Sequence, residues 1–254
     1  MTRQIADFTL VAKQNYPHAV ALRLRSGQPL PDIVPGQFVQ VRVDGSPETY
    51  LRRPISIHDV DRQHNEIVLL VQLVGEGTRR LAETPVGGLM NMVFPLGNGF
   101  TLQEKGANVL LVGGGIGIAP LFLLAKALNG QGIRPTLLLG GKSASDLIRL
   151  ADYQQLGETF VTTEDGTLGE KGFVTMHSLW KSRHVDKIYV CGPKPMMKAV
   201  AKMAAEKNVC CEVSLENLMA CGLGACLCCV EDTIDGHVCV CKEGPIFDTR
   251  RLKW

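Results

Sequence analysis

Four cysteines near the C-terminal end of the chain have a spacing that could bind a metal centre. Cys221, Cys226 and Cys229 form the pattern C-x4-C-x2-C, and eleven residues separate Cys229 from Cys241. The first three match the plant-type spacing that binds a 2Fe-2S cluster through thiolates. Two glycines between the first two cysteines allow a tight loop whose backbone amides can point toward the cluster sulfides. The spacing therefore predicts an iron-sulfur site.

Disulfides and zinc are the two other interpretations of this segment. The chain has nine cysteines, but its N-terminal residues lack the basic and apolar regions of a signal peptide. We therefore expect a reducing, cytoplasmic location, in which disulfides are rare. Zinc sites commonly use paired C-x2-C knuckles, whereas here Cys226 and Cys229 follow another cysteine, five positions before Cys226. The cluster is favoured over zinc.

The fourth ligand is either Cys239 or Cys241. In the apolar run at residues 237–241, strand alternation would put both side chains on the same side, which does not distinguish them. We choose Cys241 because the turn sequence at residues 242–247 follows it and could close the loop. Cys228, which is adjacent to a predicted ligand, is expected to point elsewhere.

Length and charge limit the classes of function. The chain has 254 residues, enough for two compact domains and a small appendage. Its 27 basic and 25 acidic residues give a net charge of +2 without a dense basic run, so no nucleic-acid surface is expected. Residues 109–125 are uncharged, but glycines and a proline interrupt them and the run is short for a membrane span. We expect no membrane segment.

The first hundred residues contain strand-like segments separated by turns that carry glycine or proline. This pattern predicts a small antiparallel β-barrel. The expected strands are residues 8–12, 19–25, 38–43 and 67–74.

Two motifs in this region could hold a phosphate-bearing ligand. Arg53 precedes a proline, which disfavours helix, so Arg53 and Ser56 lie on an extended segment and can reach one ligand. Gly75, Gly77 and Thr78 lie at an expected helix start, where free backbone amides and the helix dipole favour a pyrophosphate. Each motif alone is usually a surface turn or a loop, and their order along the chain is more informative.

From residue 108 the pattern changes to alternating strands and helices, which predicts a parallel sheet with ligands over its carboxyl edge. A strand at residues 109–112 enters a glycine turn with Gly115 and Gly117, and a helix follows. Glycines allow the backbone to approach a pyrophosphate, although a glycine turn alone is weak evidence. Cys191 ends a later strand. Further strands are expected at residues 136–140, 160–163 and 187–193.

The choice between NAD and NADP stays open at this level. The usual discriminator is an acidic residue at the end of the second strand, which binds a ribose hydroxyl and repels a 2'-phosphate. Here Lys142 lies nearer to that strand end than Asp146.

Taken in order, the barrel motifs, the nucleotide motifs and the cysteine-rich tail resemble the electron-transfer subunits of B-type, NAD-linked dihydroorotate dehydrogenases, in the ferredoxin reductase superfamily. The resemblance covers essentially the whole chain, and the tail at residues 240–247 supports Cys241 as the fourth ligand. The motifs that carry it are residues 53–56, 77–78, 113–120, 163–172, 191–196 and 215–226.

The resemblance implies three domains and three cofactors. It implies an antiparallel β-barrel flavin domain at residues 1–101, an α/β parallel-sheet nucleotide domain at 106–210 and a small iron-sulfur region at 211–254. FAD would be bound by Arg53, Pro54, Ile55, Ser56, Leu70, Val71, Gln72, Gly75, Gly77 and Thr78. NAD would be bound by Gly115, Gly117 and Cys191, and the 2Fe-2S cluster by Cys221, Cys226, Cys229 and Cys241. The chain departs from the family at residues 70–72, where an aromatic residue and an arginine are more usual, and at Cys228, where a small residue is common.

The resemblance also implies a relay between subunits in de novo pyrimidine (UMP) biosynthesis. Electrons from the FMN of a catalytic dihydroorotate dehydrogenase subunit would pass through the cluster and FAD to NAD+, in a heterotetramer with two copies of each chain. No side chain needs to act as a catalytic acid or base, and the cluster loop would face the partner. The alternatives are a subunit of an NAD(P)H:ferredoxin oxidoreductase or sulfide dehydrogenase, and a zinc-bearing interaction module on a reductase fold.

Overall fold

The computed structural model describes residues 3–254, which form two compact units. The first unit runs up to Gly99 and also contains Glu216–Asp232 and Gly236–Pro245. The second unit contains Phe100–Leu215, Thr233–Asp235 and Ile246–Trp254. Most of the cysteine-rich segment thus belongs to the same unit as the first hundred residues. The three domain ranges expected from the sequence stay a prediction.

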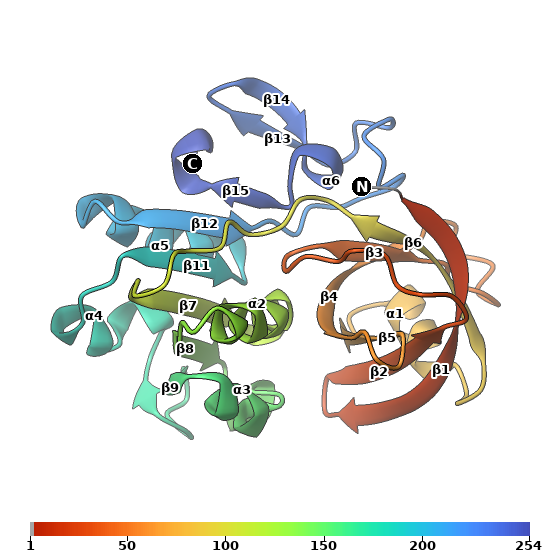
Figure 1. Cartoon of the computed structure of the whole chain (residues 1–254), viewed down its shortest axis with the longest axis horizontal. Helices are drawn as coiled ribbons and strands as arrows, with labels where there is room; N and C mark the ends of the chain where they lie inside the picture. The colour runs from red at the N-terminus through yellow and green to blue at the C-terminus, as the bar shows by residue number, and fades with distance from the viewer. Residues whose placement is uncertain (1–2) are drawn as a thin grey trace. The chain divides into compact units, whose positions relative to one another are not determined.

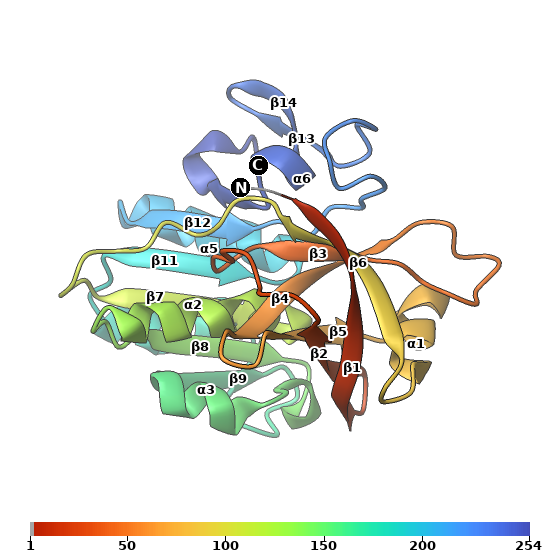
Figure 2. The same cartoon turned by 45° about the vertical axis from the view of Figure 1, so that its right-hand side comes forward.

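Six antiparallel strands close into a barrel in the first unit, which confirms the predicted class of this part (Figures 1 and 2). The order around the barrel is β1-β2-β5-β4-β3-β6. Inward-pointing apolar side chains fill it, and the rings of Phe8 and Phe94 meet edge to face with centroids 4.9 Å apart. The strands are β1 (Gln4–Tyr16), β2 (Ala19–Ser26), β3 (Phe38–Val41), β4 (Arg53–Asp61), β5 (Glu66–Gln72) and β6 (Leu89–Leu96).

Short elements complete the barrel region and the cysteine-rich tail. Helix α1 (Glu76–Glu83) follows β5 and begins after Gly75, whose extended backbone caps it. Strands β13 (Val230–Thr233) and β14 (Gly236–Cys239) pair with each other, and α6 (Val240–Glu243) follows directly. No helix among residues 3–254 is both long and apolar enough to cross a membrane.

The second unit contains a seven-stranded sheet in the order β10-β9-β8-β7-β11-β12-β15. All neighbouring strands are parallel except β15, which runs antiparallel to β12 at the edge. The strands are β7 (Val109–Gly114), β8 (Thr136–Gly141), β9 (Glu158–Thr163), β10 (Glu170–Lys171), β11 (Lys187–Cys191), β12 (Cys210–Ser214) and β15 (Ile246–Asp248). The helices are α2 (Ala119–Gly130), α3 (Leu150–Leu156), α4 (Leu179–Ser182) and α5 (Lys194–Glu206), with short 3-10 turns at Gly115–Ile118, Ala144–Asp146, Val174–Met176 and Thr249–Arg251.

The strand order alone predicts which edge of this sheet binds ligands. The chain passes from β7 to β8 and β9 on one side, then returns to β11 and β12 on the other. In open parallel sheets, ligands bind beyond the carboxyl ends of the strands at the point where this direction reverses. Here that point lies between the ends of β7 and β11.

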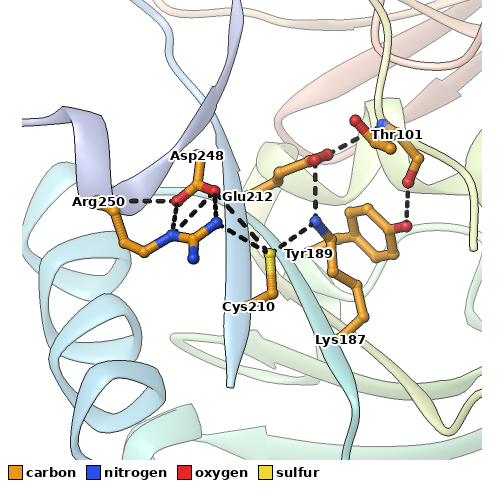
Figure 3. Close-up of polar contacts among 7 residues, drawn as sticks. All are labelled: Thr101, Lys187, Tyr189, Cys210, Glu212, Asp248 and Arg250. Carbon is orange, nitrogen blue, oxygen red and sulfur yellow. Dashed lines mark hydrogen bonds and ion pairs between the residues drawn. The ribbon is translucent and has the colours of Figure 1, made fainter. Parts of the chain in front are cut away.

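A buried ion pair joins β11 and β12 of this sheet, and a second, more exposed pair lies at β15 (Figure 3). Lys187 Nζ on β11 lies 2.9 Å from Glu212 Oε1 on β12, and both side chains are almost fully buried. The second carboxylate oxygen of Glu212 accepts a hydrogen bond from the backbone N–H of Thr101 at 3.0 Å. On β15, Asp248 forms an ion pair with Arg250. These contacts fix the start of β11 and β12 and attach the segment that enters the unit at Thr101.

Candidate functional site

Arg53 and the first turn of α1 form the site predicted for a diphosphate group. Arg53 begins β4, and its Nε would lie 2.7 Å from a Cβ placed on Gly77. Arg53 Nη1 donates a hydrogen bond to the carbonyl of Leu51 at 2.8 Å. A guanidinium beside a helix N-terminus concentrates positive charge next to free backbone N–H groups. This arrangement suits an anionic ligand, and glycine at residue 77 lets the Arg53 guanidinium lie close to the helix start.

Thr78 holds the turn that leads into α1. Its hydroxyl accepts hydrogen bonds from the backbone N–H groups of Val74 at 3.1 Å and Gly75 at 3.2 Å, and donates one to the carbonyl of Gly75 at 3.0 Å. Thr78 is buried. The hydroxyl therefore shapes the loop, and the N–H groups of the first turn are the groups available to a ligand.

The other predicted flavin contacts differ in their exposure. Pro54, Ile55 and Ser56 are half-buried at the start of β4. On β5, Leu70 and Val71 are buried and Gln72 is exposed. The structure therefore brings Arg53 and Gly77 together, whereas only Gln72 of the residue 70–72 triplet presents an exposed side chain.

The glycine turn after β7 packs directly against the end of β11. A Cβ on Gly117 would lie 2.5 Å from Gly192 Cα and 2.6 Å from the carbonyl carbon and oxygen of Cys191. These are backbone atoms that cannot rotate away. Gly115 has a φ of +55°, which favours glycine, and Pro120 lies in the first turn of α2. The structure thus brings Gly117 and Cys191 together where the strand order reverses.

Two further contacts fix this turn. A Cβ on Gly114 would lie 2.5 Å from Met196 Sδ, so that the start of α5 covers the end of β7. The hydroxyl of Tyr153 donates a hydrogen bond to the carbonyl of Ile118 at 2.8 Å. The Cys191 side chain is fully buried. Its position leaves the backbone of the turn, and not the thiol, to meet a ligand.

Asp146 lies in the 3-10 turn that follows β8, and its carboxylate binds backbone N–H groups of that turn. One carboxylate oxygen accepts hydrogen bonds from the N–H groups of Lys142 at 2.8 Å and Ser143 at 3.1 Å. Lys142 itself is exposed. The carboxylate thus closes a turn instead of extending toward a ribose.

Backbone N–H groups point at three of the four predicted ligand sulfurs. Leu223 N–H donates to Cys221 Sγ at 3.3 Å, Gly224 N–H to Cys241 Sγ at 3.1 Å, and Cys241 N–H to Cys229 Sγ at 3.3 Å. Such donors stabilise negative charge on sulfur, which is the form that binds iron. The donor set of four thiols from one segment therefore fits an iron-sulfur cluster.

The structure separates Cys239 from Cys241. Cys239 ends β14, and Cys241 lies in α6, so the expectation that strand alternation places both on one side is wrong. Gly224 lies between them: its N–H donates to Cys241 Sγ, whereas its carbonyl lies 3.8 Å from Cys239 Sγ, which acts as the donor. Cys241 thus accepts a hydrogen bond from a backbone N–H, whereas Cys239 donates one to a backbone carbonyl. Cys228 is exposed and points to the carbonyl of Leu218 at 3.7 Å.

The thiols of this segment influence one another. Burial acts to raise the pKa of Cys221, but hydrogen bonds from backbone N–H groups, led by that of Leu223, lower it to about 6. Burial and the neighbouring Cys229 raise the pKa of Cys241 to about 12. Within residues 3–254, no three His, Cys, Asp or Glu side chains are already arranged around a single ion.

The barrel also holds the segment that follows Cys241, a contact that the sequence did not predict. Asn98 N–H donates to the carbonyl of Gly244 at 2.6 Å, and its side-chain amide donates to the carbonyl of Glu243 at 3.1 Å. A Cβ on Gly97 would lie 2.5 Å from Pro245 Cδ. Nothing in the sequence of residues 95–100 indicates this contact with the segment after Cys241.

Two family models match the chain. One, described as the iron-sulfur cluster binding domain of dihydroorotate dehydrogenase B, matches residues 216–253. The other, described as an oxidoreductase NAD-binding domain, matches residues 111–202. The first range contains all four predicted cluster ligands, and the second contains Gly115, Gly117 and Cys191.

Curated relatives and solved structures agree with these matches. The chain is 41% identical over 221 residues to the dihydroorotate dehydrogenase B (NAD(+)) electron transfer subunit of Fusobacterium nucleatum, covering 84% of each chain. It is 36% identical over 248 residues to the subunit of the same name from Bacillus caldolyticus, covering 96% of this chain and 94% of the relative. An NADH-dependent reduced ferredoxin-NADP oxidoreductase structure matches with a TM-score of 0.88 and 32% identity, over 97% of this chain and 90% of that one. The ferredoxin reductase of carbazole 1,9a-dioxygenase, at 21% identity and a TM-score of 0.69 over 82% of this chain and 67% of that one, shares the fold.

Proposed function

Because the chain belongs to the family of electron-transfer subunits of NAD+-linked dihydroorotate dehydrogenase B, we propose that it carries electrons from a dihydroorotate-oxidising partner to NAD+. It is an oxidoreductase subunit with FAD, a 2Fe-2S cluster and NAD as its cofactors. The observation that carries the proposal is the set of backbone N–H groups directed at the sulfurs of Cys221, Cys229 and Cys241.

The cofactors supply the chemistry, and the chain positions them. When bound, FAD converts between single electrons and the hydride that nicotinamide requires. Arg53 and the α1 N-terminus would neutralise the FAD diphosphate, next to Gly77, where no side chain intervenes. The packed backbones of Gly117 and Cys191 would shape the nicotinamide pocket. No residue of the chain is assigned as a catalytic acid or base.

Cys221, Cys226, Cys229 and Cys241 are our proposed cluster ligands. The choice of Cys241 over Cys239 is supported by the hydrogen bonds around Gly224, which give Cys241 an N–H donor and Cys239 a carbonyl acceptor. Cys226 is exposed and Cys229 is buried. The cluster would thus be reached from one side, while the other side is covered.

The exposed side of the cysteine loop, residues 216–229, is the surface proposed to meet the catalytic partner. Leu218, Leu223 and Leu227 on this loop are 86%, 45% and 65% exposed. Leu227 also has a φ of +58°, where a leucine is strained and glycine would not be. Glycine would adopt this backbone conformation without strain. An exposed leucine here therefore supports a role for its side chain in binding a partner.

The partner, its stoichiometry and the location of the complex complete the proposal. An electron-transfer subunit works with a catalytic subunit, and we assign that subunit an FMN, a place in de novo pyrimidine biosynthesis and a complex with two copies of each chain. We assign the complex to the cytoplasm. None of the nine cysteines, all of which lie within residues 3–254, forms a disulfide, and disulfides are rare in a reducing compartment.

Co-purification with the catalytic subunit, followed by an assay of dihydroorotate-dependent NAD+ reduction, tests the function. Cys226→Ser should abolish this activity and retain NADH-driven dye reduction, because only the first reaction needs the cluster. Cys228→Ser is the control, because this thiol lies two residues away and hydrogen-bonds the carbonyl of Leu218. It should retain both activities. Equal loss of both activities in Cys226→Ser would make the cluster structural, and a colourless chain with zinc and no flavin would overturn the proposal.

A ferredoxin-linked NAD(P)H oxidoreductase subunit is the second candidate, favoured by the likeness to the ferredoxin-NADP oxidoreductase structure. The exposed Lys142 and the inward-turned Asp146 leave room for a 2'-phosphate. Reduction of ferredoxin by NADPH at rates above dihydroorotate-dependent NAD+ reduction would favour this candidate. We expect the opposite ranking.

A further inference from the structure

Gln40 is a buried polar residue that no part of the proposed function uses. It lies on β3 between two buried valines and is fully inaccessible to solvent. Neither its side-chain nitrogen nor its side-chain oxygen has a hydrogen-bond partner among residues 3–254. Leaving a buried amide unpaired costs about 1–3 kcal/mol per group, and native proteins rarely accept this without a functional reason.

The amide of Gln40 lies against the cysteine loop. A Cβ on Gly222 would be 2.8 Å from Gln40 Cγ and 3.2 Å from Gln40 Nε2. Gly222 follows Cys221 directly and has a φ of +70°. Gln40 and Gly222 belong to the same compact unit. Glycine is therefore needed at residue 222 both for its backbone conformation and for the close approach of Gln40.

The cysteine loop supplies the partner that the amide lacks. The Cys221 sulfur already accepts hydrogen bonds from backbone N–H groups, among them that of Leu223 at 3.3 Å. A 2Fe-2S cluster held by Cys221 would bring further sulfur acceptors and negative charge next to Gly222, the residue that Gln40 contacts. Hydrogen bonds to the sulfurs are among the factors that set cluster potentials.

We propose that the side-chain N–H of Gln40 donates a hydrogen bond to a sulfur at the Cys221 end of the cluster and raises its reduction potential. The proposal rests on the function above, in that it requires the cysteine loop to bind the cluster. A donor stabilises the reduced form, which carries one more negative charge, more than the oxidised form. Gln40 is thus a positioning and tuning residue on the barrel.

Gln40→Met tests the proposal, since methionine has similar length and no donor. In the complex with the catalytic subunit, a redox titration followed by paramagnetic resonance should show that one-electron reduction of the cluster becomes about tenfold less favourable. For one electron this corresponds to about −59 mV. The flavin potential should stay unchanged, as should both potentials in the control Gln63→Met, which changes an exposed glutamine of the same unit.

Isotope labelling tests the same contact in the unaltered sequence. Residues 216–245 contain no glutamine, so a nitrogen-15 hyperfine coupling to the reduced cluster in protein labelled at glutamine side chains must come from outside the segment that bears the cysteines. We expect this coupling, and we expect Gln40→Met to remove it. In the chain without cluster, Gln40→Met should unfold at the same temperature or higher, because it removes an unpaired amide.

The outcomes separate this proposal from the function on which it rests. A chain with no paramagnetic signal after reduction contradicts the proposed function. A normal cluster signal with an unchanged potential and no glutamine coupling contradicts the role of Gln40 alone. A shift of the flavin potential without a shift of the cluster potential would also overturn it, because the amide would then face the flavin.

Discussion

Gly117→Ala should damage the nicotinamide nucleotide site without harming the other cofactor sites. The added Cβ would lie 2.5 Å from Gly192 Cα and 2.6 Å from two backbone atoms of Cys191, whereas ordinary contact begins near 3.4 Å. The turn and the end of β11 must therefore separate by about 1 Å, because backbone atoms cannot rotate away. Overpacking of this kind costs about 1–3 kcal/mol. A displacement of about 1 Å in a positioned site can reduce a rate by roughly 100-fold.

Stopped-flow reduction of the flavin by NADH measures this effect directly. We expect the second-order rate constant of Gly117→Ala to fall by roughly 10- to 100-fold, while dithionite reduces flavin and cluster as in the unaltered protein. Gly130→Ala is the matched control, because Gly130 ends α2 in the same unit and a Cβ there would meet nothing within 4 Å. Unchanged reduction by NADH in Gly117→Ala would refute the inference that this packed turn shapes the nucleotide pocket.

Three further variants test the partner surface and the buried charges. In a calorimetric titration, Leu227→Asp should weaken binding of the catalytic subunit by roughly tenfold or more. Val86→Asp, at another exposed residue, is the control. Equal affinities of the two variants for the catalytic subunit would argue against a cluster loop that faces the partner. Glu66→Gln should lower the free energy of unfolding by about 1–2 kcal/mol at pH 7. Burial acts to raise the pKa of Glu66, but hydrogen bonds from two arginines lower it below its ordinary value of 4.5. The Glu66 carboxylate therefore stabilises the fold above pH 4.5. The difference in unfolding free energy between Glu66→Gln and the unaltered protein, measured with urea, should vanish as the pH falls through the folded pKa. Lys187→Met, which leaves the buried Glu212 unpaired, should cost about 3–5 kcal/mol in the same assay, and adding Glu212→Gln should recover much of this loss.

Periodicity predicted the elements that bear the nucleotide motifs because those elements are locally encoded. The apolar run before the glycine turn is buried on both faces of its strand, and the same is true of the run that ends at Cys191. Once both are strands of a parallel sheet, their carboxyl ends lie at one edge, and the contact between Gly117 and Cys191 follows from the strand order.

The pattern at the C-terminal end was less informative. The run at residues 237–241 alternates as a strand does, yet the strand ends at Cys239 and a helix begins at Val240. A short apolar run cannot distinguish the end of a strand from the first turn of a helix. Strand β6 also escaped prediction, since Pro95 near its end is a residue that strands disfavour and its methionines have no strong strand preference.

Long-range contacts of the cysteine loop could not be predicted from any local pattern. Asn98 and Gln40 lie more than 140 residues from the backbone carbonyls and glycine that they contact. Each looks ordinary in the sequence: an asparagine in a turn and a glutamine between valines. Their roles become visible only when the paired strands place them beside the cysteine-rich segment.

These contacts imply that the cluster site is a property of the barrel as well as of the cysteine motif. Strands β12 and β15 are neighbours in the seven-stranded sheet, with Ser214 paired to Ile246. The chain therefore leaves this sheet after β12 and returns to it at β15, beside the point where it left. Most of the segment between these two strands nevertheless makes its contacts with the barrel unit. Barrel substitutions that never touch a cysteine should therefore alter the cluster, and grafting the cysteine spacing alone onto another protein should not reproduce its potential.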